Sequence, residues 1–169
     1  MNHTFIIENL SQNYFVFEGM LKGLTKEQYM WRSAADKWCL LEIICHLYDE
    51  ELYDFRTRVK HTLETPEREL APIDPTGWVK SRNYIEKDYN EMVEKFLGER
   101  KYSIEWLRTL QNPNWQNAHQ HKEWGPLRAD MFLSNWLAHD YMHFRQINNI
   151  KFLYLKETTG ESLRYAGEW

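Results

Sequence analysis

Two histidines four residues apart limit how this chain can fold. His139 and His143 lie in the segment from Trp136 to Ile147, which reads WLAHDYMHFRQI. Each residue of an α-helix advances by about 100°, so residues four apart share a face and can direct two imidazoles at one ion. The same face collects mostly apolar side chains, namely Phe132, Trp136, Gln146, Ile147, Ile150 and Tyr154. The segment therefore predicts a helix whose histidines face the interior of the protein.

A third histidine, His46, stands in the segment from Lys37 to Glu51, which also has helical periodicity. Ile43 and Leu47 flank it on the expected core side, so His46 falls at the rim of the buried face. Interior histidines need partners for their ring nitrogens, and one divalent cation would serve all three rings. The other interpretation is a set of core histidines bonded to neighbouring side chains.

Helical periodicity covers most of the chain, and no segment alternates as a half-buried β-strand does. We expect four long helices, at about residues 4–22, 39–61, 78–110 with a bend near Gly98, and 127–155. Prolines at positions 66, 72 and 75 follow the second helix and predict a long crossover, which lets successive helices run parallel. The expected fold class is all-α, a four-helix bundle with a long crossover connection. With 43% apolar residues, residues 1–169 suffice for one domain.

Charge and hydropathy argue against two classes of partner. The net charge is −4 and the pI is about 6.0, and no stripe of Arg and Lys alternates with aromatic residues. The chain has no run of eighteen apolar residues, and its first eight residues lack the basic start and long apolar centre of a signal peptide. We therefore expect a cytoplasmic protein that binds neither nucleic acid nor a membrane.

Two stretches of the chain resemble motifs of the DinB/YfiT-like superfamily. Its members share a tryptophan followed by a His-Leu pair on the second helix, and a His-x-x-x-His-x-x-Gln-Ile stretch on the last. The segments from Trp38 to Leu47 and from His139 to Ile147 match these motifs. Three further stretches look like a subgroup of the superfamily, namely Trp31-Arg32, Gly125-Pro126-Leu127 and the terminal YAGEW, so the resemblance covers nearly the whole chain. It implies a DinB-like four-helix bundle with a metal held by His46, His139 and His143.

Two acidic residues lie one turn beyond His46. Asp49 or Glu50 could orient a metal ligand, accept a proton or complete the coordination shell, so both are candidate catalytic residues. The alternative is a solvated helix edge. Gln146 lies one turn beyond the histidine pair, where a hydrogen bond to a ligand is favoured over direct ligation, and it is the candidate cofactor-binding residue.

Two more histidines, His119 and His121, lie in a polar and aromatic connection at residues 112–126. They reach the metal site only if this connection folds over it as a lid. A surface loop whose tryptophans cover the end of the bundle is the equally favoured alternative.

The ligand set points to chemistry centred on a metal. Three neutral imidazoles bind borderline divalent ions and leave coordination positions open, as in catalytic sites; Zn²⁺ and Ni²⁺ lead, and Fe²⁺ is also compatible. Because the superfamily includes thiol-dependent S-transferases, we expect a metal-dependent enzyme that joins a low-molecular-weight thiol to a small-molecule substrate, or a small hydrolase. The alternative is a non-catalytic metal-binding or stress-response bundle, and a pocket beside the metal would distinguish the two.

The last expected helix is apolar on two sides, which predicts a homodimer. Leu133, Leu137 and Phe144 lie far from the histidine face, and exposed apolar surface of this kind favours a twofold interface. We also expect the segment from Thr158 to Trp169 to pack on the bundle, since Tyr165 and Trp169 are costly to leave in water.

Overall fold

Four long helical segments form the body of the protein in a computed structural model that describes residues 2–169. They are α1 (His3–Leu21), α3 (Leu40–Asp49) continued by the π-helical segment η1 (Glu50–Phe55) and by α4 (Arg56–Glu64), then α6 (Tyr89–Thr109) and α7 (Ala129–Thr159). Shorter elements connect them, namely α2 (Lys26–Met30), α5 (Trp78–Ser81) and the 3-10 turns η2 (Tyr84–Glu86) and η3 (Leu163–Ala166). The predicted all-α four-helix bundle is confirmed.

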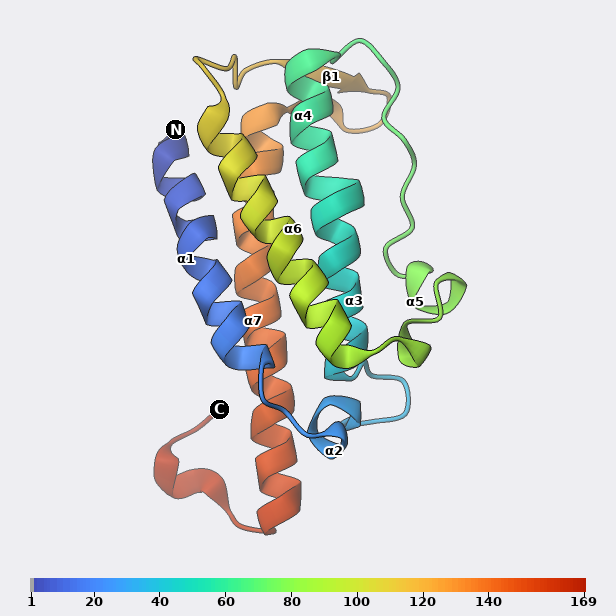
Figure 1. Cartoon of the computed structure of the whole chain (residues 1–169), viewed down its shortest axis with the longest axis vertical. Helices are drawn as coiled ribbons and strands as arrows, with labels where there is room; N and C mark the ends of the chain where they lie inside the picture. Colours follow the sequence, from blue (N-terminus) through green and yellow to red (C-terminus); the bar gives the residue numbers. More distant parts are fainter. Residues whose placement is uncertain (1) are drawn as a thin grey trace.

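The long crossover sets the order of the helices. In Figure 1, α1 runs down, α3 and α4 run up, and the segment of residues 65–77 returns along the outside to α5. As a result α6 also runs up, parallel to the helix before it, and α7 runs down the length of the bundle. The predicted crossover and the parallel pair that it allows are therefore confirmed. No helix within residues 2–169 combines the length and the apolarity needed to cross a bilayer.

The expected single helix over residues 78–110 is wrong, because the chain breaks twice before α6. Asn83 adopts a left-handed conformation with φ of 48°, which an α-helix cannot accommodate. Asp88 then starts a new helix as its side chain accepts a hydrogen bond of 2.8 Å from the backbone N–H of Glu91. Helix α6 continues through Gly98 to Thr109.

The expectation of no strand is also wrong. Residues 118–128 form a small antiparallel hairpin of β1 (Ala118–His121) and β2 (Gly125–Arg128), in which Ala118 pairs with Arg128 and His121 with Gly125. Four-residue strands are too short to show the alternation that identifies a strand in a sequence. The hairpin follows α6 and lies across the end of the bundle where α4 ends and α7 begins (Figure 1).

Both sides of α7 are covered within the chain, which removes the reason given for a dimer. Leu133 and Leu137 belong to a buried cluster with Ile6 and Leu10 of α1. Phe144 packs on Phe17 with ring centroids 4.5 Å apart. Helix α1 therefore covers the residues of α7 that the sequence assigned to a second subunit, and these residues give no support to a dimer.

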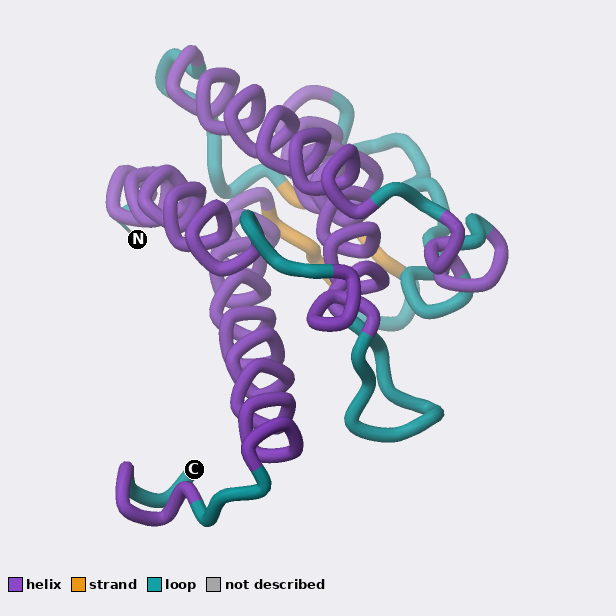
Figure 2. The backbone as a smooth tube through the Cα atoms, turned by 60° about the horizontal axis from the view of Figure 1, so that its bottom comes forward, coloured by secondary structure: helices purple, strands orange, loops and turns teal. Residues whose placement is uncertain are grey.

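In the C-terminal segment, Trp169 packs back on α7 and Leu163 is half-buried. Trp169 stacks on Phe152 at 4.7 Å, and its indole N–H donates a hydrogen bond of 3.1 Å to Asn149. Tyr165 is fully exposed, so the expectation that it packs on the bundle is wrong. Figure 2 shows why: α7 extends beyond the other helices, and the tail that follows curls beside α7 alone.

Candidate metal centre

The structure brings the three predicted histidines together. His46 comes from α3 and the other two from α7, so the site joins two helices that are distant in sequence. The Nε2 atom of His139 lies 3.3 Å from Nε2 of His46 and 3.0 Å from Nε2 of His143. One ligand nitrogen from each ring lies within 4.8 Å of the others. His46 and His143 are buried, and His139 is half-buried.

Local interactions fix the helix that carries His46. Helix α3 begins at Cys39, whose backbone N–H donates a hydrogen bond of 2.9 Å to the side chain of Glu42. Arg32 forms an ion pair with the same carboxylate, with 2.6 Å between its Nη1 atom and Oε2 of Glu42. Trp38, immediately before the helix, packs on the His46 ring with centroids 5.1 Å apart. A capped start and an aromatic wall thus set the position of the first ligand.

Burial keeps the three imidazoles neutral. It lowers the pKa of His46 to about 3, with a further contribution from His143. Burial and then the neighbouring rings lower the pKa of His139 to about 2. The pKa of His143 falls to about 4 through burial, although Gln146 and Asp140 favour its protonated form. At neutral pH each ring therefore has one nitrogen with a free lone pair, which is the form that binds a metal.

The arrangement of these nitrogens fits a divalent cation. Three facing Nε2 atoms cannot satisfy one another by hydrogen bonds, because a neutral ring supplies only one N–H. The Nδ1 atoms of His46 and His143 have no hydrogen-bond partner among residues 2–169. If Nδ1 carries the proton in each ring, the Nε2 lone pairs converge on one point, and a cation there completes the site.

Glu50 is the acidic residue that the structure places beside the histidines. Its Oε1 atom lies 4.0 Å from Nδ1 of His46 and has no hydrogen-bond partner in the described chain. Burial, followed by the neighbouring Asp54, raises the pKa of Glu50 to about 8. Glu50 begins the π-helical segment η1, and such segments are frequent at functional sites.

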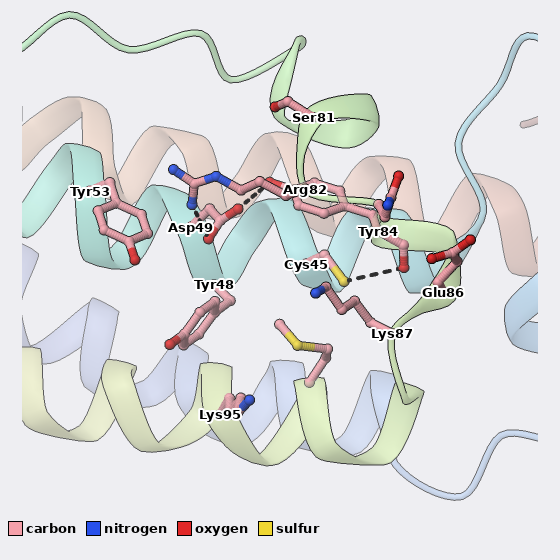
Figure 3. A pocket seen from close by; sticks show the side chains of 12 residues that line it. Cys45, Tyr48, Asp49, Tyr53, Ser81, Arg82, Tyr84, Glu86, Lys87 and Lys95 are labelled. Carbon is pink, nitrogen blue, oxygen red and sulfur yellow. Dashed lines mark hydrogen bonds and ion pairs between the residues drawn. The ribbon is translucent and has the colours of Figure 1, made fainter.

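Asp49, the other candidate, faces a different cavity (Figure 3). Its Oδ1 atom accepts a 2.7 Å ion pair from Arg82, and its Oδ2 atom accepts a short hydrogen bond from the Tyr84 hydroxyl. Burial raises the pKa of Asp49, while these two partners oppose the shift. Both carboxylate oxygens are therefore engaged away from the histidines.

The remaining candidates differ in how close they come to the site. Gln146 is near enough to raise the pKa of His143, although no hydrogen bond of good geometry joins Gln146 to Nδ1 of that ring. His119 lies in β1 and pairs through Nδ1 with the carbonyl of Pro66 at 3.0 Å. His121 stacks on Trp124 at 4.9 Å. Neither hairpin histidine joins the cluster of three.

A cavity of about 810 Å³ lies between η1, α7, the crossover and the hairpin, and none of the three clustered histidines lines it. Residues 69–73 of the crossover and the hairpin form two of its sides, and His119, His121 and Arg58 contribute polar groups. Phe55, at the end of η1, forms part of its wall and also packs on His139 with ring centroids 5.0 Å apart. Phe55 therefore joins the wall of the cavity to the ring of His139.

A buried ionic network beside the histidines escaped the sequence analysis. Arg100 of α6 is only 1% exposed, and it donates to both oxygens of Asp140, at 2.7 and 2.8 Å, and to Glu51 at 3.0 Å. The indole N–H of Trp136 donates to Glu51 at 2.9 Å, and Asn13 donates to Asp140 at 2.9 Å. A cation within the apolar stripe of α6 and an aspartate, Asp140, within that of α7 were the available signals.

Comparisons with known proteins agree with this fold. A solved structure of YfiT from Bacillus subtilis, described as "a probable metal-dependent hydrolase with an unusual four-helix bundle topology", superimposes with a TM-score of 0.77. The alignment covers 95% of this chain and 89% of that one at 16% sequence identity, so it shows a shared fold. A search of curated proteins gave no match. The family model of the DinB superfamily matches residues 9–147, and the chain therefore belongs to that superfamily.

Proposed function

We propose that the protein is a metal-dependent hydrolase that acts on a small molecule. The observation that carries the proposal is the convergence of three neutral histidines, one of which packs on Phe55 in the wall of a cavity of about 810 Å³. Enzyme sites commonly combine such a cavity with a few converging polar groups. The description of YfiT as a probable metal-dependent hydrolase supports the same reaction class for a chain of the same fold.

His46, His139 and His143 would hold the metal, with Zn²⁺ or Ni²⁺ as the leading ions and Fe²⁺ as a further candidate. A divalent ion held by three imidazoles keeps open positions and supplies an acidified water and a Lewis acid for a carbonyl or similar group. Gln146 would orient His143 from the adjacent turn of α7.

We assign the acid–base role to Glu50. Its buried carboxyl group has a pKa near neutral pH, which suits a group that exchanges protons during a reaction. Through its Oε1 atom it can also accept the Nδ1 proton of His46 after a small movement, which would fix the orientation of that ring. Asp49 receives no role in this proposal, because Arg82 and Tyr84 occupy both of its oxygens.

The cavity would bind the substrate. Its apolar walls, including Phe132 and Leu127, favour a molecule with an apolar part, while Arg58, His119 and His121 offer polar contacts. Phe55 would have to turn aside, or the substrate would have to pass its edge, for a reacting group to approach the histidines. In this arrangement the hairpin residues would contact the substrate, and the metal would be bound by residues of the helical bundle.

The experiment starts with protein purified without chelator and without a nickel column. Elemental analysis should give about one divalent ion per chain, and the variant His143→Gln should lose it. Small esters, amides and amidines are then tested for hydrolysis. Glu50→Gln should retain the metal and lose most of the rate, by about 10²-fold or more.

A second arm of the same experiment tests transfer of a low-molecular-weight thiol to an electrophile. The open metal positions would bind and deprotonate such a thiol, so the centre suits this reaction too. Conjugation without hydrolysis would replace the hydrolase proposal by the thiol-transferase one. A bound metal with neither activity would favour a non-catalytic metal-binding bundle.

A further inference from the structure

A second cavity, of about 630 Å³, lies on another face of α3 and shares no residue with the first cavity. Figure 3 shows its surroundings: α3 and η1 on one side, α6 on the other, and the α5–η2 connection above. Cys45, Tyr48 and Asp49 point into it from α3. Because successive residues of a helix are turned by about 100°, these side chains diverge from His46. The cavity is therefore separate from the metal centre.

Arg82 is the most constrained cation of this cavity. Its guanidinium carbon lies 4.4 Å from the ring centroid of Tyr53 and 4.3 Å from that of Trp78, in the corner that these two steeply inclined rings form. Nη1 of Arg82 lies 2.7 Å from Oδ1 of Asp49. Among residues 2–169, Asp49 is the ion-pair partner of Arg82, and no second carboxylate pairs with this guanidinium. A planar donor pair, held in place by two rings and a buried carboxylate, matches the spacing of two oxygens of a carboxylate or phosphate.

Lys87 adds a positive charge that no residue neutralises. It makes no ion pair in the described part of the chain, and Figure 3 shows its ammonium group reaching below Cys45 into the cavity. The carboxylate of Glu86 points to the other side of the backbone in the same view. Asp49, the buried carboxylate of the cavity, is already paired with Arg82 and accepts a hydrogen bond from the hydroxyl of Tyr84. The free groups around Lys87 are therefore mainly donors.

The aromatic wall completes the site. The hydroxyl groups of Tyr48 and Tyr53 have no hydrogen-bond partner among the described residues, and both rings line the cavity. Lys95, on the α6 side, is paired only with the exposed Glu91 at 2.5 Å. Uncommitted donors beside flat aromatic surfaces favour a ligand that has an anionic group and an unsaturated or aromatic body.

We propose that this cavity binds a small organic oxyanion, a carboxylate or phosphate ester, whose charged group is held by the cations that line the cavity, Arg82, Lys87 and Lys95. The site is independent of the metal and of the hydrolase proposal. A ligand there would contact α3 on a face next to the one that carries His46.

The test is calorimetric titration of the whole protein at about 0.15 M ionic strength, once with metal and once after chelation. The probes are inorganic phosphate, phenyl phosphate and benzoate. Saturable binding of phenyl phosphate or benzoate supports the proposal, and the tighter of the two identifies the anionic group. Phenyl phosphate should also bind more tightly than inorganic phosphate, because the tyrosine rings contribute.

The affinities of variants distinguish a specific binding site from nonspecific electrostatic attraction. Lys87→Gln removes an exposed, unpaired cation and should weaken binding about tenfold without unfolding the protein. Arg82→Lys keeps a positive charge next to Asp49 but loses the planar pair of guanidinium donors, and it should weaken binding by a similar factor. Lys60→Gln, at an exposed position of α4, is the matched control and should leave binding unchanged.

Three results would overturn the proposal. One is the lack of saturable binding by every probe at about 10 mM. Another is an equal loss of affinity in the Lys60 and Lys87 variants, which would indicate general attraction. The third is full affinity in the Lys87→Gln variant. Retained binding after the histidine centre is emptied by chelation is expected, so a failure of the hydrolase proposal leaves this site intact.

Discussion

The histidine cluster and the Arg100 network are neighbours, but they differ in how far their polar atoms are paired by hydrogen bonds. They are adjacent in sequence, since Asp140 follows His139 and Glu51 follows Glu50. In the network, all three guanidinium nitrogens of Arg100 bind carboxylates, and Oε1 of Glu51 is the network oxygen that has no partner in the described chain. In the cluster, Nδ1 of His46 and of His143 has no partner in the described chain. Most polar atoms of the network therefore satisfy one another and tie the helices together, whereas the facing nitrogens of the cluster are left to bind a ligand.

Breaking the network should have the largest effect on stability. Arg100→Met leaves Glu51 and Asp140 buried without their cation, and should lower the free energy of unfolding by about 3–5 kcal/mol. Urea unfolding followed by circular dichroism measures the change. Arg108→Met is the control, because Arg108 pairs with Glu8 at the surface and should contribute less than about 1 kcal/mol. Equal effects of the two variants would show that the network does not stabilise the fold.

Metal should stabilise the protein through the cluster alone. Free Zn²⁺ at about 100 times its dissociation constant should raise the free energy of unfolding by about 2.7 kcal/mol. His143→Gln should abolish this gain, and His121→Gln, in the hairpin, should retain it. The measurement is thermal or urea unfolding with and without Zn²⁺. The same gain in the His143 variant would mean that the ion binds elsewhere.

Acid should destabilise the metal-free protein because its folded histidines resist protonation. The pKa values of His46, His139 and His143 are about 3, 2 and 4 in the folded state, whereas an unfolded histidine has a pKa of about 6.5. Between these values the unfolded state binds more protons, so the free energy of unfolding falls as the pH falls from about 6.5 toward 4. Each histidine contributes about 1.4 kcal/mol per pH unit. Unfolding curves of chelated protein should show a shallower slope for His143→Gln, and identical slopes would contradict the assignment.

Removing a single donor from the network should have the smallest effect. Trp136→Phe deletes the N–H that binds Glu51 but leaves Arg100 in contact with the same carboxylate, so the loss should be about 1 kcal/mol. Trp124→Phe is the control, since Trp124 is exposed and its replacement should change stability by less than about 0.5 kcal/mol. A loss in the Trp136 variant as large as that of Arg100→Met would show that the network collapses as a unit.

The sequence predicted those parts of the molecule that depend on periodicity and spacing. The four helices and the crossover follow from apolar repeats and prolines. The histidine cluster follows from one pair at helical spacing together with one partner at the rim of another helix. Their positions depend on side chains that lie on known faces, and the bundle brings those faces together.

The rest depends on interactions that only the folded chain defines. Asn83 and Asp88 interrupt an apolar pattern that continues on both sides, so periodicity alone extends the helix through them. The ionic network joins Glu51, Arg100 and Asp140, whose pairing requires three helices to be placed first. The choice between Asp49 and Glu50 also needed the structure, because neighbouring residues on a helix face different surroundings.

The π-helical segment η1 affects how the sequences of related chains are aligned with one another. His46 and Phe55 are nine residues apart and would lie about 180° from each other on a regular α-helix, yet both rings pack on His139. A π turn holds one residue more than an α turn, and this extra residue returns Phe55 to the side of His46. A chain one residue shorter here would form an unbroken α-helix with the same faces turned inward. When the sequences of related chains are aligned, a one-residue gap in the middle of this helix would therefore mark the presence or absence of the π turn, and the bundle would be the same in both chains.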